Sequence, residues 1–304
     1  MGTAAPSAAH ADEAVVIAAF GRRFMVRHLG GTEESLAMAQ GRDLGLAIGD
    51  RVLIKPAGGD EQIITKLLPR RTELLRSVAR RSKVLAANID QVAIVIAPDP
   101  HYSEEIVMRV MIAAHAADLP VIMLANKQDH PRFDVIEPRL ALFESLDVQI
   151  IRISALTAPQ VTQARVRELF ENRTTVLCGE SGMGKSTLLN LLVADAEQRT
   201  AGISAALKSG RHTTTSSRLF DLDPARPEAG HLIDSPGFQQ FGLSHLSRSQ
   251  REHAMPDFND YLGQCRFHNC QHEKEPGCAI VAARDAGLID PLRYKLFIGL
   301  SEFD

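Results

Sequence analysis

The chain has 304 residues, of which 45% are hydrophobic and 23% are charged, and its formal net charge at pH 7 is −3. This length favours two or three domains, and the composition is typical of a globular protein rather than a disordered or fibrous one. No apolar run approaches the roughly 18 residues of a membrane helix, so we expect no membrane association. The slightly negative charge argues against indiscriminate nucleic-acid binding.

The first part of the chain predicts a tail followed by a small barrel. Residues 1–13 are small and polar, with no basic residue before an apolar core, which indicates a disordered tail and not a secretory signal. Within residues 14–70 we expect short strands rich in β-branched residues at 14–20, 22–28, 50–56 and 61–68. Because short strands lose their exposed edges by closing on themselves, they predict an OB-type β-barrel.

Basic residues are concentrated where this region ends. Only Glu73 opposes a group of seven, which comprises Lys66, Arg70, Arg71, Arg76, Arg80, Arg81 and Lys83. Two interpretations stay open for this group. It is either a solvated linker between domains or, beside a barrel, a surface that contacts RNA phosphates.

Residues 71–240 have the pattern of an α/β domain. Apolar strands are expected at 89–97, 121–125, 148–153 and 174–178. Ser103, followed by two glutamates, predicts the capped start of a helix that reaches residue 117, and a second helix is expected over 160–170. Continuous apolar strands that alternate with helices predict a parallel sheet with helices on both faces, which binds ligands at the carboxyl ends of its strands.

The strand at 174–178 leads into a glycine-rich loop that fits the phosphate-binding pattern G-x-x-x-x-G-K-[ST]. The loop and the start of the next helix comprise Gly179, Glu180, Ser181, Gly182, Met183, Gly184, Lys185, Ser186 and Thr187. Its backbone N–H groups are expected to converge on the β-phosphate of a nucleotide. Lys185 is expected to bridge the β- and γ-phosphates, and the Ser186 hydroxyl to bind Mg²⁺.

A second motif selects the base. Asn126-Lys127-Gln128-Asp129 fits N-K-x-D, in which the Asp129 carboxylate accepts from the two adjacent donors of guanine. Asn126 is expected to complement it, and the stem of Lys127 to pack over the base. Ser154 and Ala155, after the next strand, fit the companion loop whose backbone contacts the guanine oxygen. In ordinary GTPases the phosphate loop precedes the guanine motif, so the reversed order here indicates a circularly permuted GTPase.

Two further loops predict the magnesium site and the reaction centre. Asp234-Ser235-Pro236-Gly237 fits D-x-x-G, in which Asp234 holds Mg²⁺ through water and the Gly237 N–H faces the γ-phosphate. Thr214, in the polar loop 210–215, is expected to complete the Mg²⁺ shell, although an ordinary mobile loop is the alternative. Phe238 occupies the position of the glutamine that orients water in Ras-like enzymes, so we expect His212 to do this instead, unless it only shapes its loop.

Three of the four cysteines lie close together near the C-terminus. Cys265, Cys270, His272 and Cys278 form C-x4-C-x-H-x5-C, the ligand set of one closed, structural Zn²⁺ site. We expect this metal to hold a small domain over residues 241–304, whose core is thin. Cysteines that are free by coincidence are the alternative. Cys178 is expected to be an inert core residue, and the cysteine usage fits a reducing cytoplasm.

These motifs together resemble the RsgA (YjeQ) family of circularly permuted bacterial GTPases. The resemblance runs from about residue 14 to the C-terminus and includes LAANIDQVAIV, NKQD, ISALT, GESGMGKST, GRHTTT, DSPGFQQFGL and the four zinc ligands. Gln128 departs from the apolar residue that is frequent at its position, which leaves the base contacts untouched.

The resemblance implies GTP hydrolysis to GDP and phosphate, stimulated by the small ribosomal subunit and its rRNA, late in the maturation of that subunit. It also implies a cytoplasmic protein that acts as a monomer. Two other classes stay open, namely a P-loop ATPase or kinase and a nucleotide-binding RNA scaffold with negligible hydrolysis. Competition by ATP tests the first alternative, and a turnover assay tests the second.

Overall fold

The computed structural model describes residues 12–41, 44–59, 61–78, 81–146, 148–193, 196, 217–235 and 240–300. Residues 1–11 of the predicted tail therefore lie outside the described residues, whereas Asp12 and Glu13 belong to the first strand. None of the helices within these ranges combines the length and the apolar character that crossing a membrane requires.

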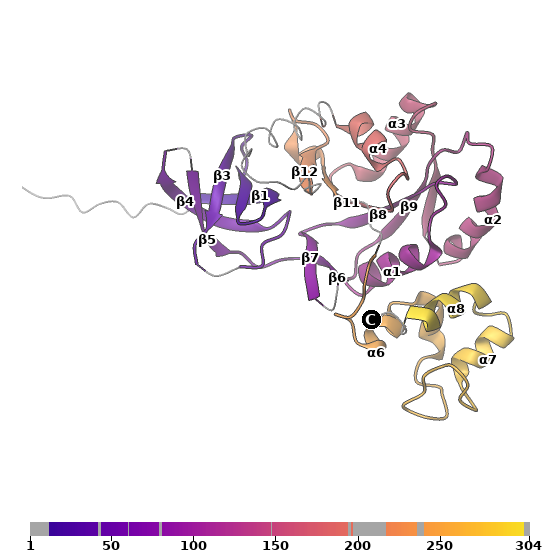
Figure 1. Ribbon diagram of the computed structural model, residues 1–304. Helices are drawn as coiled ribbons and strands as arrows, with labels where there is room; N and C mark the ends of the chain where they lie inside the picture. The colour runs from indigo at the N-terminus through magenta and orange to yellow at the C-terminus, as the bar shows by residue number, and fades with distance from the viewer. Residues whose placement is uncertain are drawn as a thin grey trace, which may run out of the picture.

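The N-terminal region is a closed five-stranded barrel, as the strand pattern predicts (Figure 1). Its strands are β1 (Asp12–Phe20), β2 (Arg23–His28), β3 (Glu34–Ala39), β4 (Arg51–Gly58) and β5 (Glu61–Leu67). They follow the order β1-β2-β3-β5-β4, and pairing of β4 with β1 closes the barrel. A β-bulge between Val16 and Ala18 bends β1, whose residues 12–15 pair with β4. The alternating residues Val16, Val26, Ile54 and Ile64 are buried.

The basic segment after the barrel contains a β-hairpin and is therefore not an irregular linker. Its strands are β6 (Glu73–Val78) and β7 (Arg81–Ala87). Arg70, just before it, donates to both carboxylate oxygens of the buried Asp50 at 2.7 and 2.9 Å, and to Glu73 at 2.7 Å. These acceptors raise the pKa of Arg70 against the effect of burial. Arg70 thus attaches the hairpin to the barrel.

A mostly parallel sheet forms the centre of the molecule. Its strands are β8 (Gln91–Ile96), β9 (Val121–Ala125), β10 (Gln149–Arg152), β11 (Thr174–Cys178), β12 (Arg218–Asp221) and β13 (His231–Asp234). They follow the order β10-β9-β8-β11-β13-β12, and only β12 is antiparallel to its neighbour. One register pair, Ala18 with Arg218, joins β12 to the barrel strand β1. The predicted parallel sheet is confirmed, with an antiparallel strand added at the side that faces the barrel.

Helices cover both faces of this sheet. They are α1 (Glu104–His115), α2 (Phe133–Glu144), α3 (Pro159–Phe170) and α4 (Lys185–Leu192), with the short 3₁₀ turn η1 (Pro227–Ala229) before β13. In Figure 1, α3 and α4 lie on one side of the sheet and α1 on the other. Ser103 accepts a hydrogen bond from the Ile106 amide at 3.3 Å and caps α1, as predicted. Ile106 occupies the third helical position, so no carboxylate completes a capping box.

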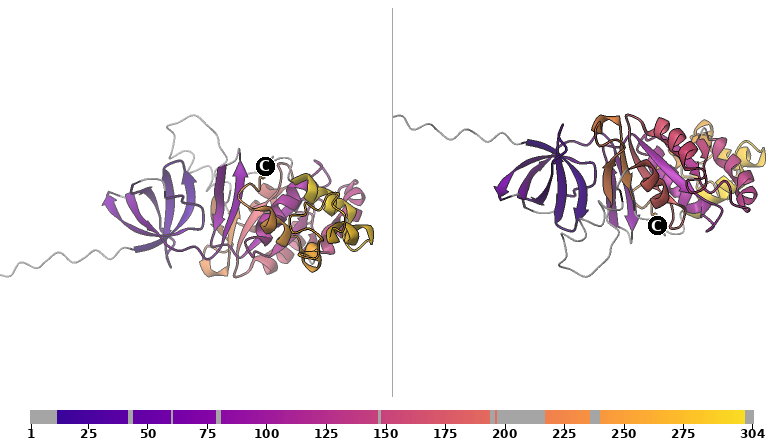
Figure 2. Two further views of the ribbon diagram at one scale, coloured as in Figure 1. Left: turned by 90° about the horizontal axis from the view of Figure 1, so that it is seen from below. Right: turned by 90° about the horizontal axis from the view of Figure 1, so that it is seen from above.

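The C-terminal region contains short helices and, over residues 243–300, no strand. Its elements are α6 (Arg248–His253), the 3₁₀ helix η2 (Pro256–Tyr261), α7 (Ala279–Asp285) and α8 (Pro291–Gly299). The buried Arg293 of α8 attaches the region to α2, because it donates to the Leu142 carbonyl at 2.8 Å and to Ser145 at 2.7 Å. Figure 2 shows this region and the barrel at opposite ends of the molecule, with the sheet between them.

Candidate functional site

Four loops that are far apart in the sequence meet at one edge of the sheet. They follow β9, β10, β11 and β13, which run parallel to one another through β8. Two backbone hydrogen bonds show how closely the loops join. The Ile153 amide donates to the Ala125 carbonyl at 2.9 Å, and the Gln128 amide donates to the Ile153 carbonyl at 3.0 Å. The N-K-x-D loop and the Ser154-Ala155 loop are therefore one continuous surface.

Asn126 connects this surface to the glycine-rich loop. Its side-chain amide donates to the Met183 carbonyl at 3.0 Å and its Oδ1 accepts from the Ala155 amide at 3.1 Å. Only 3% of the residue is exposed. Both hydrogen-bonding partners of the Asn126 side chain lie in neighbouring loops, so this side chain fixes the spacing between the base motif and the phosphate motif.

Lys127 forms a second bridge between the two motifs. Its ammonium group donates to the Gly182 carbonyl at 3.0 Å and to the Asp99 carbonyl at 2.5 Å. The contact with Asp99 identifies the loop after β8 as a further wall of the site, which the sequence motifs did not indicate. In the same wall, the Ser103 amide donates to the Glu180 carboxylate at 2.6 Å. Sequence motifs could not reveal this wall, because it depends on the strand order, which places β8 beside β11.

Asp129 presents its carboxylate at the surface of the site. The Ser154 hydroxyl hydrogen-bonds this carboxylate and holds its pKa below the ordinary value. Ser154 is itself 8% exposed, and its Oγ also accepts from the Asp129 amide at 3.2 Å. The carboxylate is thus ionised at neutral pH and is held in position by Ser154, which suits a group that accepts two hydrogen bonds from a base.

The glycine-rich loop fits so closely against its neighbours that an added Cβ atom at any of its three glycines would lie within 3.0 Å of another atom, and Gly179 and Gly184 are the most restricted. At Gly179 a Cβ atom would lie 2.4 Å from the Val95 carbonyl oxygen, and at Gly184 it would lie 2.2 Å from Nδ2 of Asn126. Both residues also have positive φ, at +146° and +95°. The loop backbone can therefore pass directly beneath β8 and the base motif.

Lys185 and Asp234 form the charged centre of the site. The buried Lys185 ammonium donates to the carbonyls of Gly179 and Glu180, both at 2.8 Å. Burial lowers the pKa of Lys185, and burial raises that of Asp234 although the charge of Lys185 opposes this shift. Oδ1 of Asp234 is buried and makes no hydrogen bond to any described residue. A buried carboxylate oxygen without a donor, close to an ammonium group, fits a cation ligand.

The remaining predicted residues divide into two groups. Ser181, Ser186 and Thr187 are described and exposed, in the loop and in the first turn of α4. His212, Thr214 and Gly237 lie outside the described residues. Cys178 is fully buried, and burial raises the pKa of its thiol to about 12, so it is an unreactive core residue, as expected.

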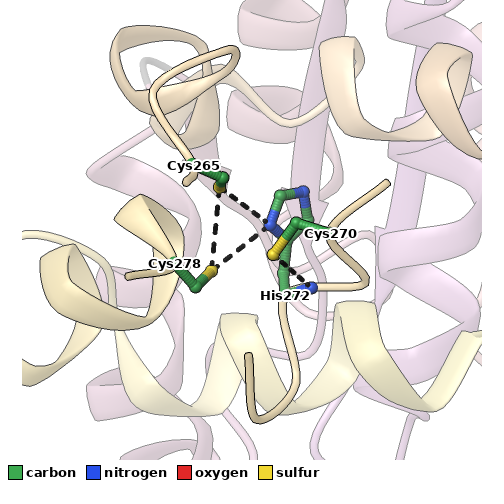
Figure 3. Close-up of side chains that lie close together, drawn as sticks. All are labelled: Cys265, Cys270, His272 and Cys278. Atoms are coloured by element: carbon green, nitrogen blue, oxygen red, sulfur yellow. Dashed lines mark hydrogen bonds between the residues drawn. The ribbon is translucent and has the colours of Figure 1, made fainter. Parts of the chain in front are cut away.

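The C-terminal region brings the predicted metal ligands together (Figure 3). The ligand atoms of Cys265, Cys270, His272 and Cys278 all lie within 4.8 Å of one another. Nδ1 of His272 lies 3.6 Å from Sγ of Cys265 and 3.4 Å from Sγ of Cys278, and the two sulfur atoms are 3.9 Å apart. A tetrahedral zinc shell with Zn–S of about 2.3 Å places its sulfur atoms roughly 3.8 Å apart, so the cluster has the dimensions of such a shell.

Surrounding groups orient these ligands. Nε2 of His272 lies 3.3 Å from the Glu252 carboxylate, which leaves Nδ1 directed into the cluster. Arg248 holds the same carboxylate at 2.7 Å. Backbone amides of Ala279 and Val281 donate to sulfur atoms of the cluster, each at 3.4 Å. A carboxylate behind the histidine and amides on the thiolates are the outer contacts typical of structural zinc sites.

The chain is similar to known proteins of one family. A family model described as RsgA GTPase matches residues 67–244. A protein of Burkholderia pseudomallei named small ribosomal subunit biogenesis GTPase RsgA is 44% identical over 286 residues, which cover 94% of this chain and 90% of that protein. A protein of the same name from Ralstonia pickettii is 41% identical over 300 residues and covers 98% of this chain and 95% of its own.

Two solved structures have a similar fold. The crystal structure of YjeQ from Thermotoga maritima superimposes with a TM-score of 0.69 at 24% identity and covers 95% of this chain and 96% of its own. The structure of YloQ, described as a circularly permuted GTPase, gives a TM-score of 0.67 at 20% identity, with 99% and 97% of the two chains covered. At these identities the likeness supports the arrangement of the strands and helices.

Proposed function

Since this chain belongs to the RsgA family of GTPases, we propose that its four edge loops bind one guanine nucleotide and that the GTP they hold is hydrolysed to GDP and phosphate. The observation that carries the proposal is the position of Asn126, which is hydrogen-bonded to both Met183 and Ala155. A base held at Asp129 and phosphates held above Lys185 then belong to the same molecule.

Recognition of the base rests on Asp129. Its carboxylate accepts from N1–H and the 2-amino group of guanine, a pair of donors that adenine lacks. The backbone of Ser154 and Ala155 contacts the guanine oxygen, and the stem of Lys127 packs over the ring. The Ser154 hydroxyl keeps the carboxylate ionised, which strengthens both hydrogen bonds.

Binding of the phosphates rests on the glycine-rich loop and α4. Backbone amides of residues 179–184 and the positive end of α4 surround the β-phosphate. Lys185 exchanges its two carbonyl acceptors for β- and γ-phosphate oxygens and stabilises the charge that develops during transfer. The unpartnered oxygen of Asp234 and the exposed hydroxyl of Ser186 suit Mg²⁺, which neutralises phosphate charge when bound.

Three residues outside the described ranges complete the proposed machinery. Thr214 contributes to the Mg²⁺ shell in the GTP state, the Gly237 N–H faces the γ-phosphate, and His212 orients the attacking water. His212 is assigned this role because Phe238 has no group that can do so. A His212→Ala variant that binds GTP normally but has lost most turnover is the expected result. Full turnover in that variant would remove the assignment.

We further propose that the partner is the small ribosomal subunit, which the names of both relatives contain. Within the basic group, Arg70 and Arg71 are engaged in ion pairs inside the protein. Lys66, Arg81 and Lys83 are exposed and are the better candidates for contacts with rRNA phosphates. The protein then acts as a monomer whose chain divides into a tail (1–11), the barrel (12–70), the GTPase domain (71–240) and the zinc domain (241–304).

The Cys265–Cys278 cluster is proposed to hold one Zn²⁺ ion with a structural role. Four protein ligands close the tetrahedral shell, so no position remains for a substrate. The helix α6 buries none of its residues and α7 buries Ile280 and Ala283, and metal ligation adds stability to these short helices.

Turnover of GTP by the full chain, measured with purified small subunits, large subunits and neither, tests the proposed function. We expect at least tenfold stimulation by small subunits alone, and no turnover in a Lys185→Ala variant in any of the three conditions. Equal rates in all three conditions would contradict the assignment of the partner. The absence of any hydrolysis would leave a nucleotide-binding scaffold.

A further inference from the structure

The β6–β7 hairpin is hydrogen-bonded to the segment that follows the D-x-x-G motif. The Ser77 amide donates to the Gly242 carbonyl at 2.9 Å, and the Gly242 amide donates to the Ser77 carbonyl at 3.0 Å. This reciprocal pair is an antiparallel β-bridge outside the regular strands. Ser77 is the last residue but one of β6, close to the tip of the hairpin, and the bridge joins segments that are more than 160 residues apart in the chain.

The Ser77 side chain adds to the bridge. Its Oγ accepts from the His245 amide at 3.2 Å and lies 3.0 Å from Nδ1 of the His245 ring. Ser77 is 3% exposed, so water does not compete for these hydrogen bonds. At Gly242 a Cβ atom would lie 2.8 Å from the Ser77 carbonyl oxygen, a backbone atom that cannot move away without opening the bridge. We call Ser77, Gly242 and His245 the latch.

The other end of the hairpin is joined to the barrel. Ala86 of β7 pairs with Ile48, and the Ala87 amide donates to the Ile48 carbonyl at 2.8 Å. Asn88 donates from its side chain to the Gly49 carbonyl, also at 2.8 Å. The hairpin is thus hydrogen-bonded to the barrel at its base and, through Ser77 near its tip, to Gly242 and His245.

Along the chain, Gly242 and His245 of the latch lie between the nucleotide site and the metal cluster. Gly242 lies eight residues after Asp234, the last residue of β13, and α6 begins at Arg248. Glu252 of α6 contacts His272 of the cluster. A shift of residues 240–247 relative to the sheet therefore acts on the hairpin through Ser77 and on the zinc domain through α6.

We propose that Ser77, Gly242 and His245 are positioning residues that link the nucleotide state to the hairpin and, through it, to the barrel. GTP and GDP favour different positions of residues 240–247, and the two-way bridge makes β6 follow these residues. By reciprocity, a polyanion that fixes the barrel and the hairpin biases residues 240–247 and, through them, the choice of nucleotide. This inference rests on the proposed nucleotide site, but not on the identity of the ribosomal partner.

Hydrogen–deuterium exchange of the full, zinc-loaded chain tests the latch. Peptides that cover β6 and β7 are compared with GDP and with a non-hydrolysable GTP analogue. We expect their exchange rates to differ at least fivefold between the two nucleotides, within the usual range of coupling between sites. The Gly242→Ala variant should reduce this difference to less than twofold while its affinity for GDP stays unchanged.

The matched control is Gly299→Ala, since a Cβ atom there meets no other atom within 4 Å. It should retain the full difference. Equal exchange in the two nucleotides in the wild-type chain would overturn the inference, and so would a full difference in Gly242→Ala. Should Gly242→Ala fail to fold, Ser77→Ala decides: it removes only the hydroxyl contacts, so a reduced difference supports the latch and an unchanged one contradicts it.

The two proposals fail in different ways. The exchange experiment contains no ribosomes, so a nucleotide-dependent hairpin without stimulation by small subunits leaves the latch in place and removes the partner. Stimulation by small subunits with a hairpin that does not respond to the nucleotide removes the latch and leaves the partner.

Discussion

The side-chain amide of Asn126 donates a 3.0 Å hydrogen bond to the carbonyl of Met183, which joins the base motif to the phosphate loop. This contact explains why the reversed order of the motifs does not matter. Adjacent parallel strands place their following loops at the same edge of a sheet whichever strand comes first in the chain. Permutation changes the connections between the strands and leaves the neighbours at the edge unchanged.

Replacement of Asp129 by asparagine should change the base that the site prefers. Asparagine offers one acceptor and one donor, so it loses a hydrogen bond to guanine but can donate to the 2-oxo group of xanthine. We expect GTP affinity to fall at least about tenfold, since a hydrogen bond to a charged group contributes about 1.5–3 kcal/mol. Xanthosine triphosphate should bind more tightly than GTP.

The control for this change is Asp118→Asn, in an exposed turn after α1. It should leave both affinities unaltered in a titration with fluorescent nucleotides. An Asp129→Asn variant that still prefers GTP would show that the carboxylate does not contact the base.

A Gly184→Ala substitution should abolish nucleotide binding. The added Cβ atom would lie 2.2 Å from Nδ2 of Asn126 and would push the base motif away from the phosphate loop. Gly287→Ala is the matched control, because Gly287 also has positive φ, at +75°, but no atom lies within 4 Å of its added Cβ. Calorimetric titration with GDP should give no binding for the first variant and normal binding for the second. Normal binding in both would mean that the Asn126 contact is not needed.

Sequence patterns predicted the parts of the fold that depend on local signals. Strands with continuous apolar residues, such as Thr174–Cys178, coincide with β11, and Ser103 caps α1 as expected. The strand β3 (Glu34–Ala39) was missed because alanine and glutamate have low strand propensity, and this segment is extended because it pairs with β2 and β5.

Long-range pairing explains the other differences. The hairpin β6–β7 has a basic sequence that resembles a linker, and it is held by partners from distant segments, among them Asp50 and Gly242. The helix α2 contains Pro138, which obscures its pattern, although Ile136 and Phe143 are buried against the sheet. In the site, the motifs identified the residues that approach the nucleotide, whereas the wall after β8 carries no motif and depends on strand order alone.

The ion pair between Arg27 and Asp221 should stabilise the junction between the barrel and β12. Both side chains are buried, and His231 donates to the same carboxylate at 2.9 Å. Replacement of Asp221 by asparagine leaves Arg27 buried without its counter-charge, which costs about 3–5 kcal/mol. Urea unfolding at pH 7 should show this loss. The control is Asp223→Asn, which removes an exposed ion pair with Arg226 and should not move the midpoint.

The pKa of the Asp221 carboxylate predicts how the stability of the chain depends on pH. Burial would raise the pKa of Asp221, but the hydrogen bond from His231 and the charge of Arg27 hold it below its ordinary value. A depressed pKa adds stability above the unfolded value of about 4, and this stability is lost as the pH falls through the folded value. Below pH 4, the urea midpoint of the wild-type chain should therefore decrease with falling pH more steeply than that of Asp221→Asn. Parallel pH profiles would contradict this account.

Loss of the metal should unfold the C-terminal region. A Cys270→Ser variant should lower the zinc content from about one equivalent to near zero, because three ligands do not fill the tetrahedral shell. Cys178→Ala, which removes the one cysteine outside the cluster, should retain a full equivalent. Atomic absorption gives the metal content, and proteolysis reports the folding of residues 243–300. A Cys270→Ser chain that retains its zinc would show that the cluster does not bind it.

Competition between nucleotides is the most direct test of a single guanine-specific site formed by the four loops. A fluorescent GDP bound to the full chain is displaced with GTP, GDP and ATP in the presence of Mg²⁺. A site that pairs Asp129 with guanine should release the probe at GTP concentrations at least about 100-fold lower than those of ATP. Equal displacement by ATP and GTP would contradict the assignment of Asn126 and Asp129 to the base.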